Sequence, residues 1–267
     1  MVPQLSSVRA FAVAALSVLG VVVLYLVFVR TSQGQRVDQS ALDHLGWSTA
    51  TRESISTVLD IITFGVLALV LTGCVVLALG RRRWALAVGA LALVAVSNVT
   101  TQLLKHQILT RPDLGNSSLN SFPSGHTTAA ASLAMAALLV VPPRLRWLVA
   151  IVGAVSVAVT GVGTVVAGWH RPSDVVAALL VTLAVGSAVV GLLAIGRDAD
   201  PATPPYTRTF AIVAALPVAA AVLLGLGVRP DGTERDLVLH ILVMGVLATL
   251  TAMVLALFAR LVDTRFG

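Results

Sequence analysis

Long apolar runs recur along the 267-residue chain, and they constrain its fold more than any other feature. Each run has about 20 residues, which is the length that a helix needs to cross a bilayer. Hydrophobic residues make up 57% of the chain, charged residues 11%, and the mean hydropathy is +0.96. Soluble domains are not this apolar. The sequence therefore predicts an all-α protein, a polytopic transmembrane helical bundle embedded in the bilayer.

Eight apolar runs have the length and hydropathy of membrane spans. Their approximate bounds are 8–29, 55–79, 84–109, 125–141, 145–166, 174–195, 210–226 and 237–261. The sequence predicts a six-span core in residues 1–196, a cytoplasmic Pro-rich linker in 197–208, and two additional transmembrane helices in 209–267. The first run is longer than the core of a signal peptide, so we expect it to be retained as a helix.

The distribution of arginine predicts how these spans are oriented. With the N-terminus in the cytoplasm, ten basic and three acidic residues lie on the cytoplasmic side, as the positive-inside rule requires. An even number of spans returns the C-terminus to that side. Membrane topology thus accounts for the net charge of +6, and the arginines form no continuous basic face of the kind that binds nucleic acid. We expect a multi-pass protein of the cell membrane without a nucleic-acid partner.

A polar turn, Ser121-Phe122-Pro123-Ser124-Gly125-His126, opens onto one of the apolar runs and suits an anion. Ser124 can cap the helix, which leaves the first backbone N–H groups pointing outward at the positive end of the helix dipole. Gly125 lets the backbone approach a ligand closely, and His126 adds a proton donor. On these residues alone, an ordinary capped helix with an interfacial histidine fits equally well.

A second polar segment is predicted to reach the same outer face. Lys105 is the only lysine among 18 basic residues, and it continues a helical stripe formed by Asn98, Thr101 and Gln102. One interpretation is that the lysine snorkels to the membrane interface. The other is that it binds an anion together with Arg111, and the isolation of this charge near the end of an apolar helix favours that interpretation.

A third segment carries a histidine and a carboxylate four residues apart. His170 and Asp174 lie at the start of the sixth predicted span, where Ser173 is a candidate cap. One helical turn brings the two side chains within reach of each other. A carboxylate that accepts the proton of one ring nitrogen leaves the other nitrogen as a base or nucleophile. The alternative is a helix-capping aspartate beside a solvated histidine.

Taken in order, the three segments resemble the signature motifs of the type 2 phosphatidic acid phosphatases. This family is the membrane branch of the acid phosphatase and vanadium haloperoxidase superfamily. The motifs are Lys105 with Arg111-Pro112, then Pro123-Ser124-Gly125-His126, then His170 with Asp174. The resemblance covers about the first six predicted spans, and the ordered combination is far more specific than any single motif.

The resemblance implies a role for each motif residue. His170 would attack phosphorus and carry a phosphohistidine, with Asp174 orienting its ring, while His126 would protonate the leaving oxygen and then activate water. The residues implied to bind the phosphoryl oxygens are Lys105, Arg111, Ser124 and Gly125. No metal and no cofactor is implied, because these cations supply the electrostatic stabilisation.

Two positions depart from the family pattern. Five residues separate Lys105 from Arg111, which is one fewer than the usual spacing. The third motif normally has Ser-Arg shortly before the nucleophile, and here Gly163 and Thr164 stand at those positions. A phosphate-binding arginine is therefore missing, and we hypothesise that Arg171 replaces it.

The resemblance implies an integral-membrane lipid phosphatase acting on the outer leaflet. Its substrate would be a phosphomonoester or pyrophosphate of a polyprenyl, glycerolipid or sugar lipid. One alternative is a non-catalytic binder or transporter of phosphorylated lipid, which the missing arginine and the two extra spans motivate. Another is a phosphoryl or head-group transferase, which differs only in its acceptor. The presence of both histidines and the aspartate favours an enzyme over a binder, because anion binding alone needs no nucleophile.

Overall fold

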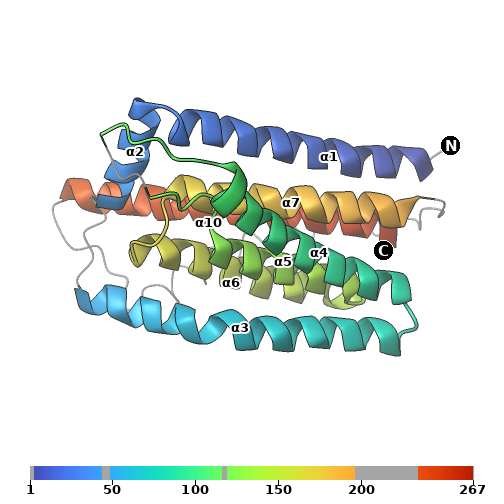
Figure 1. Cartoon of the computed structure of the whole chain (residues 1–267). Coiled ribbons are helices and arrows are strands. Elements are labelled where there is room, and N and C mark those ends of the chain that lie inside the picture. The colour runs from blue at the N-terminus through green and yellow to red at the C-terminus, as the bar shows by residue number, and fades with distance from the viewer. Residues whose placement is uncertain (1–2, 44–48, 116–118, 196–233, 267) are drawn as a thin grey trace.

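The computed structural model describes residues 3–43, 49–115, 119–195 and 234–266. Within these ranges the chain is a bundle of long helices without a β-strand, which confirms the predicted all-α class (Figure 1). The elements are α1 (Pro3–Leu24), η1 (Tyr25–Val29), α2 (Ser32–Asp43), α3 (Thr49–Gly80), α4 (Trp84–Leu103), η2 (Leu104–Ile108), α5 (Gly125–Val140), η3 (Pro143–Leu145), α6 (Arg146–Val166), α7 (Pro172–Ala194) and α10 (Glu234–Phe266).

Five helical stretches of the described chain are long and apolar enough to cross a membrane. They are Ser7–Val29, Trp84–Ile108, Pro143–Val166, Pro172–Ala194 and Leu242–Asp263, and the shorter apolar helices are Gly65–Gly80 and Gly125–Val140. Each coincides with a predicted span. The predicted seventh span and the linker at 197–208 lie outside the described residues. The division into a six-span core and two added helices stays a prediction.

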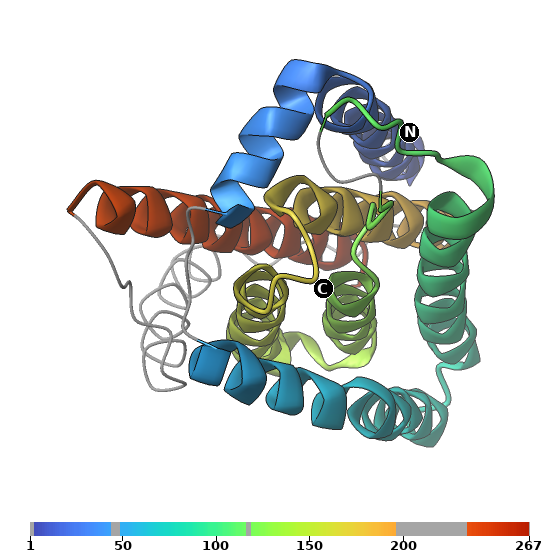
Figure 2. The ribbon, with the colours of Figure 1, turned by 60° about the vertical axis from the view of Figure 1, so that its left-hand side comes forward.

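Two helices with many small residues, α5 and α7, occupy the middle of the bundle. α5 packs against α3, α4, α6 and α7, and α7 also packs against α1 and α10. Figure 2 shows α5 and α6 enclosed between α3 on one side and the layer of α7 and α10 on the other. At Gly186 a Cβ atom would lie 2.9 Å from the ring of Phe258, so this glycine lets α10 approach α7 closely. The described C-terminal helix is therefore packed onto the centre of the bundle.

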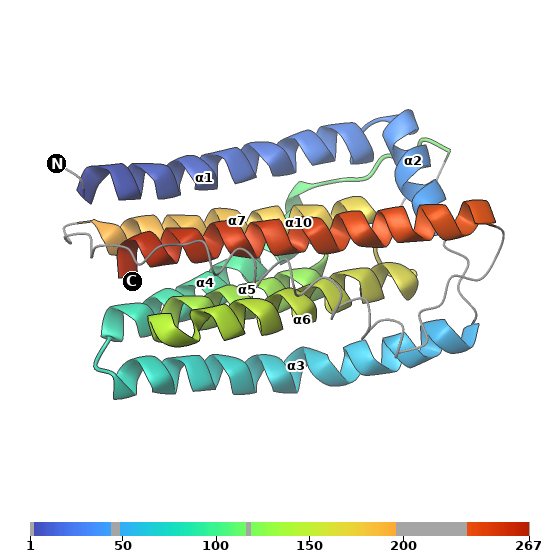
Figure 3. The same ribbon diagram turned by 180° about the vertical axis from the view of Figure 1, so that it is seen from behind.

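Helices α3 to α7 alternate in direction, which places the connections between them at the two ends of the bundle (Figures 1 and 3). The segments that follow η2, precede α5 and join α6 to α7 all lie at one end, beside α2 (Figures 1 and 3). The link between α3 and α4 lies at the opposite end, and it carries the basic triplet Arg81-Arg82-Arg83. All three sequence motifs therefore meet at one end of the bundle.

Candidate active site

The polar turn before α5 forms the predicted helix cap. Ser124 is the N-cap of α5, and its Oγ accepts hydrogen bonds from the N–H and the hydroxyl of Thr127 at 3.3 and 3.0 Å. The backbone N–H of Ser124 donates to the carbonyl oxygen of Asp174 at 3.0 Å. Because Asp174 lies in the first turn of α7, this bond fixes the start of α5 beside the start of α7. The predicted capping role of Ser124 is confirmed.

The turn between α6 and α7 is a glycine-dependent helix ending. Gly168 has φ +77°, a left-handed conformation that favours glycine. The N–H groups of Gly168 and Trp169 donate to the carbonyls of Val165 and Thr164, each at 3.0 Å, which is the Schellman arrangement. The N–H of His170 also donates to Thr164 O, at 3.2 Å. Thr164, which stands where the family pattern has arginine, is buried. Its backbone carbonyl oxygen accepts the bonds from Trp169 and His170 that hold this turn.

The carboxylate of Asp174 collects several hydrogen bonds on one oxygen. Its Oδ2 lies 3.3 Å from Nδ1 of His170, and it accepts from Ser121 Oγ at 2.6 Å and from the N–H of Arg171 at 2.9 Å. Asp174 is fully buried and His170 is 7% exposed. Arg171 is the N-cap of α7, so Ser173 lies within the first turn and is not the cap. The predicted contact between His170 and Asp174 is present.

The two histidines lie close together although they come from different turns. The ring centroids of His126 and His170 are 6.5 Å apart, and the ring planes meet at 66°. The ring of Trp169 packs beside His126 with centroids 5.1 Å apart. Because no helix separates the two imidazoles, both can contact one small ligand at the mouth of the bundle.

Three cationic side chains gather around the buried carboxylate. Arg111 is 6% exposed and Arg171 is 5% exposed, while Lys105 is half-buried in the π-helical turn η2. Burial, followed by the charge of Arg171, lowers the pKa of Arg111, while the carboxylates of Asp174 and Asp38 oppose that shift. Lys105 also interacts electrostatically with Asp174. This arrangement concentrates positive charge where the sequence predicts an anion.

The guanidinium of Arg171 is held by two uncharged acceptors. Its Nε donates to Oε1 of Gln39 in α2 at 2.9 Å, and its Nη1 donates to Oγ of Ser121 at 2.9 Å. Neither Gln39 nor Ser121 was predicted from the sequence to belong to the site. Ser121 lies in the predicted polar turn, so the sequence indicated its proximity to the site. Gln39 lies outside all three motifs, so no sequence signal pointed to it.

The stripe on α4 faces the bundle interior only in part. The hydroxyls of Thr101 and Thr128 are 2.9 Å apart, and Asn98 donates to Ser132 Oγ at 3.2 Å. Gln102, in contrast, is exposed. The buried Thr101 and the half-buried Asn98 therefore bond α4 to α5 below the site, and only the continuation of the stripe at Lys105 belongs to the cationic cluster.

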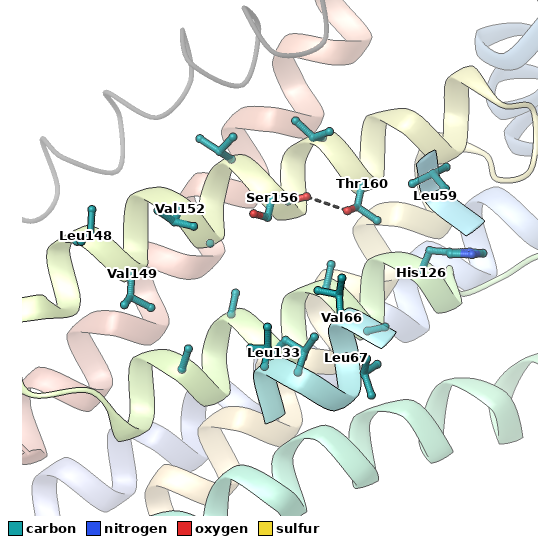
Figure 4. Close-up of a pocket in the computed structure, with 18 residues that line it drawn as sticks. Leu59, Val66, Leu67, His126, Leu133, Leu148, Val149, Val152, Ser156 and Thr160 are labelled. Atoms are coloured by element: carbon teal, nitrogen blue, oxygen red, sulfur yellow. Dashed lines mark hydrogen bonds between the residues drawn. The ribbon is translucent and has the colours of Figure 1, made fainter. Parts of the chain in front are cut away.

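An apolar groove runs along the bundle from His126. It has a volume of about 670 Å³ and lies between α3, α5 and α6 (Figure 4). Its lining includes Leu67, Leu133 and Val152, with Thr160 and Ser156 among its few polar side chains. This volume falls within the range of about 300–1,000 Å³ that is typical of ligand sites. An imidazole thus lies at one end of a mostly hydrophobic groove.

Comparison with known proteins gives one result. Residues 66–195 match the family model described as PAP2 superfamily. That segment contains α4 to α7 and all eight residues that the sequence analysis assigned to the site, which are Lys105, Arg111, Ser124, Gly125, His126, His170, Arg171 and Asp174. No curated protein and no solved structure matches the chain.

Proposed function

Since the chain belongs to the PAP2 superfamily through residues 66–195, we propose that it is an integral-membrane lipid phosphatase. Its substrate is a phosphomonoester or pyrophosphate whose lipid is a polyprenyl, a glycerolipid or a sugar lipid. The observation that carries this proposal is the placement of the two imidazoles, with ring centroids 6.5 Å apart at the mouth of the bundle. A nucleophile and a general acid are both needed on opposite sides of one phosphorus atom.

In the first half-reaction the histidine of the third motif is the nucleophile. Asp174 holds the proton on Nδ1 of His170, so that Nε2 presents its lone pair to phosphorus. The N–P bond forms as the bond from phosphorus to the leaving oxygen breaks. His126 donates a proton to that oxygen, and the lipid alcohol or lipid monophosphate leaves.

In the second half-reaction water replaces the lipid. The now neutral His126 removes a proton from the water as its oxygen attacks phosphorus, and the N–P bond breaks. Inorganic phosphate is released, and both histidines return to their starting protonation states. A water acceptor makes the protein a phosphatase, whereas an alcohol acceptor would make it a transferase.

The charge that develops on the phosphoryl oxygens is stabilised by protein groups. Lys105, Arg111 and Arg171 supply positive charge, and the N–H of Gly125 is directed outward at the start of α5. Ser124 contributes by fixing that helix end. The proposed mechanism uses no metal ion, because these groups supply the electrostatic stabilisation that a metal ion would otherwise supply.

The apolar groove supports a lipid substrate. A hydrocarbon chain lying between α3, α5 and α6 would place its phosphate next to His126. Burying apolar surface stabilises binding by about 25 cal/mol per Å². The basic triplet Arg81-Arg82-Arg83 lies at the opposite end and favours the cytoplasm. This supports our proposal that the site faces the extracytoplasmic side of the cell membrane.

Phosphate release by the detergent-purified protein tests the enzymatic proposal. We expect turnover with at least one member of a panel of polyprenyl, glycerolipid and sugar-lipid phosphates. His170→Ala should reduce that turnover by about 10⁴-fold or more, as removal of a nucleophile does in other covalent mechanisms. Lipid binding without turnover by the unmodified protein would identify it as a binder instead.

The groove assignment has its own test. Val152→Trp places bulk across the groove and should raise KM for long-chain substrates about tenfold while leaving KM for a short-chain phosphate unchanged. Val99→Trp is a matched control, because Val152 and Val99 are 56% and 57% exposed and only Val152 lines the groove. Equal effects of the two substitutions would contradict the assignment.

A further inference from the structure

α2 is a short polar helix that lies against the site although it is outside the matched family segment. Gln35, Asp38 and Gln39 are spaced i, i+3 and i+4, so they share one face of this helix. Gln35 is 0% exposed and Asp38 is 3% exposed, which is unusual for polar residues. Each of the three side chains bonds to a segment that carries a motif.

The first of these bonds reaches the loop of the first motif. Nε2 of Gln35 donates to the carbonyl of Pro112 at 2.9 Å and to that of Val29 at 2.8 Å. Tyr25 donates its hydroxyl proton to the carbonyl of Thr110 at 2.8 Å. The backbone on both sides of Arg111 is therefore fastened to the N-terminal part of the chain.

The other two bonds reach the turn of the third motif. The carboxylate of Asp38 accepts from the N–H of Ser173 at 3.1 Å and from its hydroxyl at 2.6 Å. The amide oxygen of Gln39 accepts from Nε of Arg171 at 2.9 Å. Ser173 and Arg171 lie between His170 and Asp174, so α2 grips the segment that joins these two residues.

We propose that α2 completes the site, with Gln39 as the positioning residue that orients Arg171 toward the phosphoryl group and Asp38 as the anchor of the same turn. This inference rests on the proposed phosphatase function. A guanidinium has five N–H donors in a fixed plane. Bonds from Nε to Gln39 and from Nη1 to Ser121 fix that plane, and Nη2 remains for an anion.

The two acceptors that bond to the Arg171 guanidinium carry no charge, and this affects how the arginine can bind an anion. The side chains of Gln39 and Ser121 are both uncharged, and in the described part of the chain no carboxylate forms an ion pair with the Arg171 guanidinium. The arginine is thus oriented without a direct ion pair. Asp38 interacts with its charge without bonding to the guanidinium, which remains able to bond a phosphate. A carboxylate in place of Gln39 would orient the guanidinium equally well but would cancel that charge.

A double-mutant cycle with orthovanadate as the probe tests the proposal. Vanadate resembles the phosphoryl group in the transition state, and its inhibition constant reports on the anion site. We expect Gln39→Leu, which keeps the side-chain volume but removes the acceptor, to raise that constant and lower kcat/KM by about tenfold. Arg171→Ala should have a larger effect, and the double variant should be no worse than Arg171→Ala alone.

The controls separate positioning from folding. Val37→Ala changes a 55% exposed residue of the same helix and should leave both the inhibition constant and kcat/KM unchanged. Thermal melts of each full-length variant in detergent check folding. Gln39→Ala, which also removes the acceptor, replaces Gln39→Leu if that variant unfolds. If Gln39 variants behave as Val37→Ala does, or if the effects of Gln39→Leu and Arg171→Ala add, the inference is wrong. If the unmodified protein binds vanadate but releases no phosphate, the phosphatase proposal fails instead.

Discussion

Two buried arginines lie at opposite ends of the bundle, and they are held in opposite ways. Arg146, at the start of α6, is 1% exposed and donates from Nη1 to Oδ1 of Asp263 in α10 at 2.8 Å. Arg171, at the start of α7, is 5% exposed and donates to the neutral oxygens of Gln39 and Ser121. The first cation bonds directly to a counter-ion, whereas the second bonds directly only to dipoles and interacts with the charge of Asp38 without a direct bond.

The difference shows how the same residue type can support either the fold or the site. A buried cation paired with a carboxylate has little remaining field, so it joins two helices and does no more. A buried cation held by amide and hydroxyl groups keeps its field but must be stabilised by its surroundings. At the site end that cost is acceptable if an anion binds there, because the anion then completes the charge balance.

The largest expected effect concerns the paired arginine. Asp263→Ala leaves the charge of Arg146 buried without its carboxylate and should destabilise the protein by about 3–5 kcal/mol. The change should not alter kcat/KM of the folded protein by more than about twofold, since this pair is at the far end from the histidines. Denaturant unfolding in detergent measures the first quantity and phosphate release the second. A loss of kcat/KM in folded protein would show that the two ends are coupled.

The second prediction concerns the site end of the bundle, where Asp38 should make the unfolding free energy depend on pH. Burial first, and then the charge of Asp174, raises the pKa of Asp38 to about 6 from an ordinary value of 3.8, against the favourable influence of Ser173 and Arg171. Arg111 is a further charge that interacts with Asp38. A carboxyl whose pKa is raised by folding stabilises the fold below the unfolded pKa and loses that contribution as pH rises.

We therefore expect the unfolding free energy to fall by about 3 kcal/mol between about pH 3 and pH 7 on account of Asp38, since one pKa unit corresponds to about 1.4 kcal/mol. Asp38→Asn should flatten the pH dependence of Tm in that window. Ser40→Ala, on the same helix, is the control that should keep the slope. An unchanged slope in Asp38→Asn would mean that this carboxyl is solvated.

A smaller effect addresses the unpaired arginine. Arg171→Ala should lower kcat/KM by about 100-fold, in line with removal of a single donor to a developing oxyanion. Arg171→Lys should recover little of it, because an ammonium cannot bond to Gln39 and Ser121 in one plane. Tm should change far less than in Asp263→Ala. If Arg171→Ala keeps full activity, Arg171 does not replace the arginine that is missing at Thr164.

The smallest effect tests the turn that presents His170. Gly168→Ala introduces a Cβ at φ +77° and should cost about 1–2 kcal/mol of unfolding free energy. Gly73→Ala in α3 is the control, because no atom lies within 4 Å of the added Cβ and alanine favours a helix. Thermal melts of both variants provide the measurement, and equal Tm shifts would contradict a special role for Gly168.

The sequence was sufficient for the helices and the three motifs because both signals are local. Apolar run length predicted each span that the structure describes, and the spacing of His170 and Asp174 predicted their contact. The contribution of α2 was not predictable in this way. Asp38 and Ser173 are 135 residues apart, and no periodicity relates one to the other. Such a bond depends on how helices are placed in space, which residue spacing does not encode.

The bond from the N–H of Ser124 to the carbonyl of Asp174 has a mechanical consequence. It joins the first turns of α5 and α7 directly, so the turn that bears His126 is tied to the turn that bears Asp174. The apolar groove lies on the other side of α5, against α3 and α6. A ligand that enters along the groove would therefore leave this contact between α5 and α7 in place.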